Sequence, residues 1–171
     1  CVATRFFVSS PVMGEALRER LKQSSFASPY QEAVLSVLVC ADYLDRQVEK
    51  ICEEYGLTTP QYNVLRILRG VYPAGHARCD IIERMIHTAP DVTRLIDRLV
   101  SAGLAQRTKS EADGRLSMTY ITEAGLDILR KMQPAVDQVN AEIAGRLTSE
   151  EAMVLTSLCE RIYGAEVKNS A

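Results

Sequence analysis

The chain has 171 residues, of which 47% are hydrophobic and 25% are charged. This balance is typical of a globular protein and excludes a mainly disordered chain. No apolar run reaches the roughly 18 residues of a transmembrane helix. The N-terminal segment is interrupted by polar residues and Pro11, so it makes a poor signal peptide. We therefore expect a cytoplasmic protein.

The cysteines and histidines argue against a metal centre. The five cysteines are widely spaced without a CxxC pair, and there are only two histidines. Neither a disulfide framework nor a zinc site is predicted, and we expect no metal and no cofactor. Cys40, Cys52 and Cys159 fall on apolar helix faces and are interpreted as small core residues, with a redox-sensing thiol as the alternative.

The net charge of −2 conceals an uneven distribution. Residues 66–118 contain nine basic and six acidic side chains, a net charge of +3, so the rest of the chain carries −5. A basic middle between acidic ends is typical of a DNA-binding region on an acidic support.

In chain order, residues 1–27 show no sustained period and are predicted to be an N-terminal extension, with one short amphipathic stretch near residues 14–22. Ser28, Pro29 and Gln31 form a helix-start signature, and Gly56 ends that helix. This helix carries an apolar stripe whose positions alternate by three and four residues: Val34, Val37, Ala41, Leu44, Val48, Ile51 and Tyr55. A stripe this long exceeds the needs of a small core, so part of it is predicted to pack on a partner chain.

Three shorter helices are predicted next. The first starts at Thr59-Pro60 and ends at Gly70, and the second is a short amphipathic helix that buries Ile81. Thr88 is predicted to cap the third, which runs over residues 89–102 and is closed by Gly103.

The period then changes to that of strands. Residues 104–110 and 115–121 are short, contain β-compatible residues and are separated by Glu111-Ala112-Asp113-Gly114, which predicts a β-hairpin. Thr122 is predicted to cap a helix that Pro134 should kink, and residues 148–151 form a capping box for a last helix.

The predicted fold is therefore mainly α with a small β-hairpin wing (α+β), a winged helix-turn-helix with N- and C-terminal dimerisation helices. We expect an N-terminal extension at 1–27, a helical dimerisation region at 28–57 and 122–165, and a DNA-binding lobe at 58–121.

Two short helices followed by a hairpin are in the order of a winged helix-turn-helix, whose second helix enters the major groove. The helix at 89–102 has an apolar inner face, and its outer positions carry residue types that read bases. Arginine can bond guanine at two atoms, and threonine can contact a thymine methyl or a phosphate. The outer residues are Asp91, Thr93, Arg94, Asp97 and Arg98.

The hairpin carries further candidate contacts. Arg107, Lys109 and Arg115 flank its tip, where an arginine can enter the narrow minor groove. Asp113 is predicted to orient Arg107 or Arg115 through an ion pair. Phosphate contacts are expected from Arg69, Arg84, Arg98 and Lys109.

Several runs together resemble the MarR family of transcriptional regulators over about residues 30–165. They are GLTTPQYNVLRILRG, DVTRLIDRLVSAGLAQR, DGR and ITEAG. The resemblance implies a homodimer held by the first and last helices, with DNA contacts at Thr93, Arg94, Arg98 and Arg115 and a wing acid at Asp113. Where relatives often have two wing arginines, this chain has Gly114-Arg115.

The resulting hypothesis is a homodimeric, ligand-responsive repressor on a pseudo-palindromic operator with half-sites about 10 bp apart. The resemblance implies a small aromatic or phenolic effector, for which Arg46 and Tyr62 are the candidate contacts. A ligand would act by shifting the population of DNA-binding conformations.

Three alternatives are considered. A redox-sensing regulator of the same fold would use Cys40 or Cys52, and an interaction module without DNA binding would not need Arg94, Arg98 and Arg115. An enzyme is not expected, because the adjacent pairs Glu53-Glu54 and Glu150-Glu151 diverge and no GxSxG, HExxH or Gly-rich phosphate loop occurs.

Overall fold

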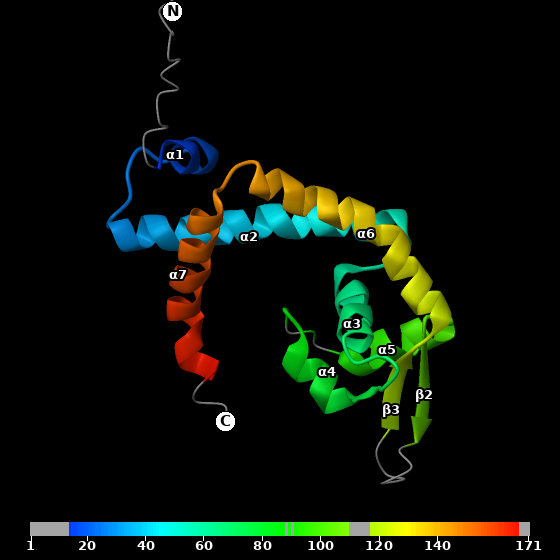
Figure 1. Cartoon of the computed structure of the whole chain (residues 1–171). Helices are drawn as coiled ribbons and strands as arrows, with labels where there is room; N and C mark the ends of the chain where they lie inside the picture. Colours follow the sequence, from blue (N-terminus) through cyan, green and yellow to red (C-terminus); the bar gives the residue numbers. More distant parts are fainter. Residues whose placement is uncertain (1–13, 88, 90, 110–116, 168–171) are drawn as a thin grey trace, which may run out of the picture. The chain divides into compact units, whose positions relative to one another are not determined.

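The computed structural model describes residues 14–87, 89, 91–109 and 117–167. It confirms a mainly helical fold with a small antiparallel sheet (Figure 1). None of the helices in these ranges is long and apolar enough to cross a membrane. The elements are α1 (Glu15–Leu21), α2 (Pro29–Glu54), α3 (Thr59–Arg69), β1 (His76–Ala77), α4 (Arg78–Arg84), α5 (Val92–Ser101), β2 (Ala105–Lys109), β3 (Ser117–Ile121), α6 (Glu123–Ala144) and α7 (Ser149–Val167).

The chain divides into two units, residues 1–47 and 48–171. In the first, α1 lies beside α2, and Leu17 is buried. The guanidinium of Arg20 is 2.9 Å from the carboxylate of Asp42. The predicted cap of α2 is confirmed, because the backbone N–H of Gln31 donates to Ser28 Oγ at 3.2 Å.

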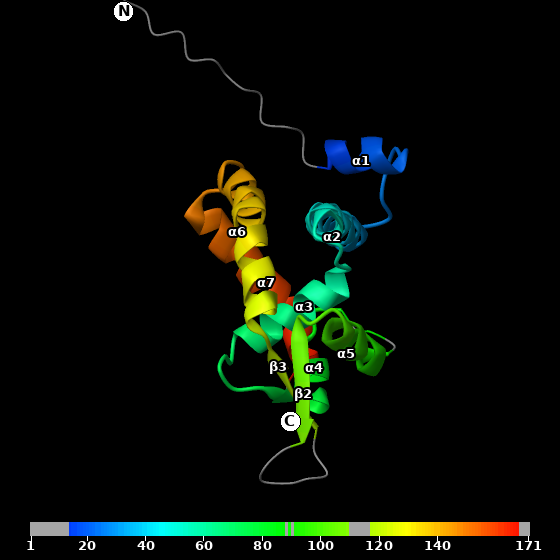
Figure 2. The same cartoon turned by 90° about the vertical axis from the view of Figure 1, so that its right-hand side faces the viewer.

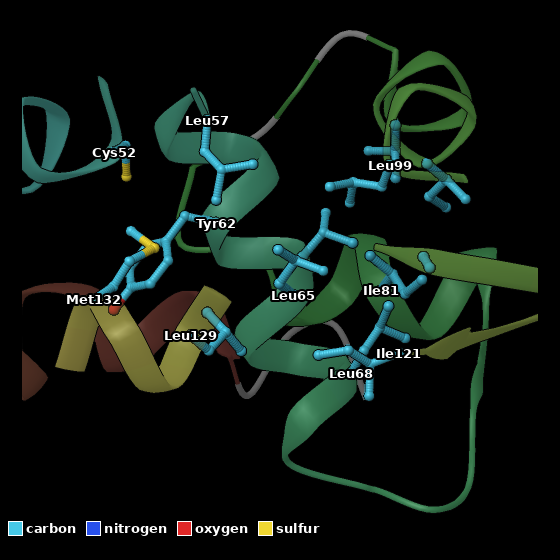
Figure 3. Packing of buried hydrophobic residues seen from close by; sticks show 14 of the residues in the cluster. Cys52, Leu57, Tyr62, Leu65, Leu68, Ile81, Leu99, Ile121, Leu129 and Met132 are labelled. Atoms are coloured by element: carbon cyan, nitrogen blue, oxygen red, sulfur yellow. The ribbon is translucent and has the colours of Figure 1, made fainter. Parts of the chain in front are cut away.

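The second unit has one hydrophobic core, built around α3 (Figure 3). Val64, Leu65 and Leu68 are fully buried, as the 3.6-residue helical period requires of positions that face inward. Burying a side chain of this size contributes about 1.5–3 kcal/mol each. Residues from other elements complete the core: Cys52, Ile81, Ile96, Leu99, Ile121, Leu129 and Met132.

The sheet has three strands in the order β1-β3-β2. The predicted hairpin is present, with Arg107 opposite Thr119 and Lys109 opposite Ser117. The prediction missed β1, whose His76 pairs with Thr119. Two residues are too few to show an alternating pattern, so this strand has no sequence signal.

The start of α5 differs from the prediction. The helix begins at Val92, and Asp91 caps it by accepting from the backbone N–H of Arg94 at 3.0 Å. A residue that precedes proline is disfavoured in the helical region, so Ala89 before Pro90 is a poor helix residue. Thr88 and Pro90 themselves lie outside the described residues.

Local signals position α6 and α7 as predicted. The backbone N–H of Gly125 donates to the Thr122 hydroxyl at 3.1 Å, and Glu151 and Thr148 make both bonds of a capping box. Helix α6 continues past Pro134 and changes direction along its length (Figure 1), which agrees with the kink expected there.

Two glycines around β2 are required by geometry. Gly103 has a φ of 72° after α5, a conformation that favours glycine. A Cβ on Gly125 would lie 2.3 Å from the carbonyl oxygen of Leu104, so α6 approaches the start of β2 more closely than another residue allows. Gly103 therefore allows the turn between α5 and β2, and Gly125 allows α6 to pack closely on the start of β2.

Candidate nucleic-acid interface

Helix α5 has a buried apolar face and an exposed polar face. Val92, Ile96 and Leu99 are buried in the core, at spacings of four and three residues. The side chains predicted to read DNA are all exposed on the other face: Thr93, Arg94, Asp97 and Arg98. Their spacing places Thr93 with Asp97 on one ridge and Arg94 with Arg98 on a second ridge.

The first ridge is joined to the sheet. Arg107 of β2 places its Nη1 2.9 Å from Asp97 Oδ1, which links the outer face of α5 to the base of the hairpin. Helix α5 packs against β2, and Figure 2 shows α4 and α5 beside the hairpin. An exposed pair of this kind adds at most about 1 kcal/mol to stability, so its main effect is to orient Arg107.

The second ridge faces the beginning of α3. Arg94, Leu95 and Arg98 line a hollow of about 230 Å³ together with Pro60 and Asp91. Arg94 is three-quarters exposed, and its Nε lies 3.8 Å from Asp91 Oδ2. Arg98 has no ion-pair partner among the residues that the structure describes. Both guanidinium groups therefore retain donors for a base or a phosphate.

Helix α4 and the turn after it are held by side-chain contacts that the sequence did not indicate. The backbone N–H of Ile86 donates to Asn63 Oδ1 of α3 at 2.9 Å. At the other end, the backbone N–H of Ala77 donates to Asp80 Oδ2 at 3.2 Å. These bonds satisfy polar groups at both ends of the short helix, so α4 keeps its place beneath α5.

The wing is described only in part. The backbone of Lys109 ends β2, but its side chain lies outside the described residues, as do Asp113 and Arg115 entirely. The predictions for these three residues are therefore untested. Of the predicted wing contacts, Arg107 is the one whose side chain the structure describes.

Two of the predicted phosphate contacts have protein partners. Arg69 Nη1 donates to Gln133 Oε1 of α6 at 3.3 Å, and Arg84 Nη1 donates to the carbonyl of Asp80 at 2.8 Å. A guanidinium carries five N–H donors, so these single bonds leave donors for a phosphate on either side chain.

The two candidate effector contacts lie in different units. Tyr62 is buried in the core of the second unit, burial raises the pKa of its hydroxyl, and the Arg66 guanidinium lies 5.8 Å from its ring centre. Arg46 belongs to the first unit and pairs with Asp42 at 2.7 Å.

The cysteines do not all have the role that was predicted. Cys52 is a core residue, fully buried, and burial raises the pKa of its thiol to about 11. The interpretation of Cys40 as a core residue is wrong for this chain, because the side chain is exposed, and Cys159 is half-buried. A protonated, buried thiol is a poor nucleophile, so Cys52 is unsuited to sensing oxidants.

Comparison with known proteins agrees with this geometry. The MarR family model matches residues 55–116. HosA, a transcriptional regulator of Escherichia coli O111:H-, is 30% identical over 109 residues, which are 64% of this chain and 79% of HosA. A MarR transcription factor from Planctomyces limnophilus is 38% identical over 80% of this chain and 98% of that chain, with a TM-score of 0.60. PcaV from Streptomyces coelicolor, solved with its natural ligand, is 25% identical over 74% of this chain and 91% of PcaV, with a TM-score of 0.61.

An amphipathic helix with outward arginines, packed on a second helix and beside a β-hairpin, defines a winged helix-turn-helix DNA-binding regulator. The relatives named above are transcriptional regulators. The chain belongs to the MarR family.

Proposed function

We propose that the protein acts as a homodimer that binds a pseudo-palindromic operator and represses transcription until an effector releases it. One observation carries the proposal: α5 buries its apolar face and presents Thr93, Arg94, Asp97 and Arg98 outward, with Arg107 of the wing beside them. Each protomer would place α5 in the major groove, and two copies would read half-sites about one helical turn apart.

The homodimer is supported by apolar side chains that the described part of the chain leaves exposed. On α7, Met153, Leu158 and Ile162 are 71%, 47% and 66% exposed. On the first half of α2, Val34 and Leu38 are also more than half exposed. A soluble monomer rarely leaves contiguous apolar surface of this kind open, so a second copy is the proposed cover.

A small aromatic or phenolic effector is the proposed signal. PcaV, which is similar to this chain, was solved with a natural ligand. Arg46 and Tyr62 remain the proposed contacts, and Arg46 is the better first target because Tyr62 is part of the core. The effector would act by favouring one of two dimer conformations that differ in their affinity for DNA.

The first experiment selects genomic duplex fragments with the purified protein at two salt concentrations and measures its mass by light scattering. We expect a dimer that enriches palindromic fragments, and we expect Arg94→Ala to lose this enrichment. Arg130→Ala is the matched control, since Arg130 is an exposed arginine of α6 that pairs with Asp127 at 2.8 Å. A bidentate base contact is worth about 1–3 kcal/mol of discrimination, so the selective affinity should fall by roughly 5- to 150-fold.

Two results would contradict the proposal. A dimer that binds every fragment equally at both salt concentrations does not read sequence. A protein that binds no fragment after unfolding and refolding, which strips a retained effector, is an interaction module rather than a regulator of transcription.

A further inference from the structure

A hollow of about 390 Å³ opens on the side of α5 that carries Thr93, between α4, α5 and the sheet. Its walls include Arg78 of α4, Arg107 of β2 and Ser117 of β3. The hollow is much larger than the about 30 Å³ that one water molecule takes in the liquid, so it has room for a solvated polyatomic group.

The charged side chains that line this hollow are basic. Among the residues that the structure describes, two arginines line it and no carboxylate does. Of the two arginines, Arg107 pairs with Asp97 at 2.9 Å, and Asp80 of α4 accepts from the backbone N–H of Ala77. Arg78 is exposed, and none of the residues that the structure describes forms an ion pair with it. The lining therefore carries, on Arg78, a positive charge that no described residue pairs.

Hydroxyl groups accompany the two cations. Thr93 and Ser117 are exposed and line the hollow together with Arg107. Guanidinium and hydroxyl donors are the groups that bond phosphate oxygens in protein–DNA complexes. Asp97 contributes indirectly, since its ion pair holds the Arg107 guanidinium at this edge of α5.

We propose that this hollow receives one phosphate of the DNA backbone, and that Arg78 is a phosphate-contacting residue which fixes the register of α5 in its groove. The inference rests on the proposed function, because α5 must lie in the major groove for a flanking phosphate to reach the hollow. The donors belong to α4, α5, β2 and β3, so one phosphate would tie all four elements to the DNA backbone.

The test compares Arg78→Gln with Arg130→Gln, which removes the same charge from α6. Dissociation constants are measured for a duplex recovered by the selection above and for a scrambled duplex, each at four salt concentrations. We expect Arg78→Gln to weaken both duplexes by a similar factor, on the order of tenfold per protomer, because a phosphate contact carries no sequence information. The slope of log K against log salt should fall by about 1 per protomer. Arg130→Gln should leave both constants and both slopes near the wild-type values.

Circular dichroism melting checks that both variants are folded, which is expected because both side chains are exposed. If Arg78→Gln matches Arg130→Gln, the inference is wrong while the proposed function stands. If it weakens the selected duplex alone with no change in slope, Arg78 reads a base and the phosphate assignment is wrong. If the wild-type protein binds neither duplex, the proposed function fails and this inference fails with it.

A free phosphate would share the chemistry of a backbone phosphate. Inorganic phosphate is therefore titrated into the wild-type protein without DNA, and the amide signals of Thr93 and Ser117 are followed by NMR. Binding of inorganic phosphate together with unchanged DNA affinity in Arg78→Gln would identify a small-anion site and overturn the DNA assignment.

Discussion

At the scale of single residues, packing decides what each cysteine can do. Cys52 and Cys40 lie twelve positions apart on α2, yet the first is fully buried and the second is exposed. Desolvation of Cys52 penalises its thiolate, which is the main cause of the raised pKa, and a weaker hydrogen bond with Thr59 acts in the opposite direction. The same residue type is therefore inert at one position and accessible at the other.

This burial predicts a pH dependence of stability. The pKa of Cys52 rises from 9.0 to about 11 on folding, so between these values the folded chain binds more protons than the unfolded chain. The contribution of the protonated thiol to the free energy of unfolding is fully present below pH 9 and is lost as the pH rises through 11. The difference between the two pKa values corresponds to a change in the free energy of unfolding on the order of 2 to 3 kcal/mol. Urea unfolding of the wild type and of Cys52→Ala between pH 8 and 11 measures it.

The alanine variant is the control, because it keeps every other titrating group. Its free energy of unfolding should fall less over this range than that of the wild type. Equal losses in the two proteins would show that Cys52 does not titrate as its burial requires.

At the scale of elements, one side chain connects the helix-turn-helix and the wing to α6. The Thr122 hydroxyl donates to the carbonyl of Gly103 at 2.7 Å and accepts from the backbone N–H of Gly125 at 3.1 Å. The first bond reaches the loop after α5, and the second caps α6. Thr122 thus links the end of α5 to α6, the helix that follows the hairpin.

Removing this hydroxyl should weaken both ends of the connection. We expect Thr122→Ala to lower the free energy of unfolding by about 1–2 kcal/mol, which is the cost of losing a helix cap. Denaturant titration followed by circular dichroism measures the change. Thr122→Ser keeps the hydroxyl and should lose less than half of that amount, whereas equal losses in the two variants would assign the effect to the methyl group.

At the scale of the whole molecule, α7 carries apolar side chains that the described residues leave exposed. Leu158 and Ile162 lie four residues apart and are both exposed. They contribute little to folding of the monomer, and their burial would favour association.

A charge on this face should therefore separate the protomers without unfolding them. We expect Leu158→Glu to reduce the mass measured by light scattering to about half and to leave the circular dichroism spectrum unchanged, since a buried unpaired carboxylate at an interface is costly. Gln106→Glu adds the same charge on β2, away from α7, and should remain dimeric. A Leu158→Glu variant that keeps the full wild-type mass would place the interface elsewhere.

Features that depend on near neighbours in the chain can be predicted from the sequence alone. The order of the helices, the hairpin, the outward residues of α5 and the caps at Ser28, Thr122 and Thr148 were all predicted and confirmed. Helix periods and caps join residues within about four positions, so a single sequence carries them. The prediction of Thr88 as the N-cap of α5 was wrong, because Asp91, three positions later, is also a good capping residue and is the one that caps the helix.

Contacts between residues that lie far apart in the chain became known only from the fold. The pairing of His76 with Thr119, the ion pair of Asp97 with Arg107, and the position of Arg78 at the hollow have no signal in the sequence. Each depends on how the chain closes its loops and fills its core, which is settled by the summed packing of many residues rather than by a local preference. The residue types on the outward face of α5 can therefore be predicted from the sequence, whereas the contacts that these residues make within the protein are set by the fold.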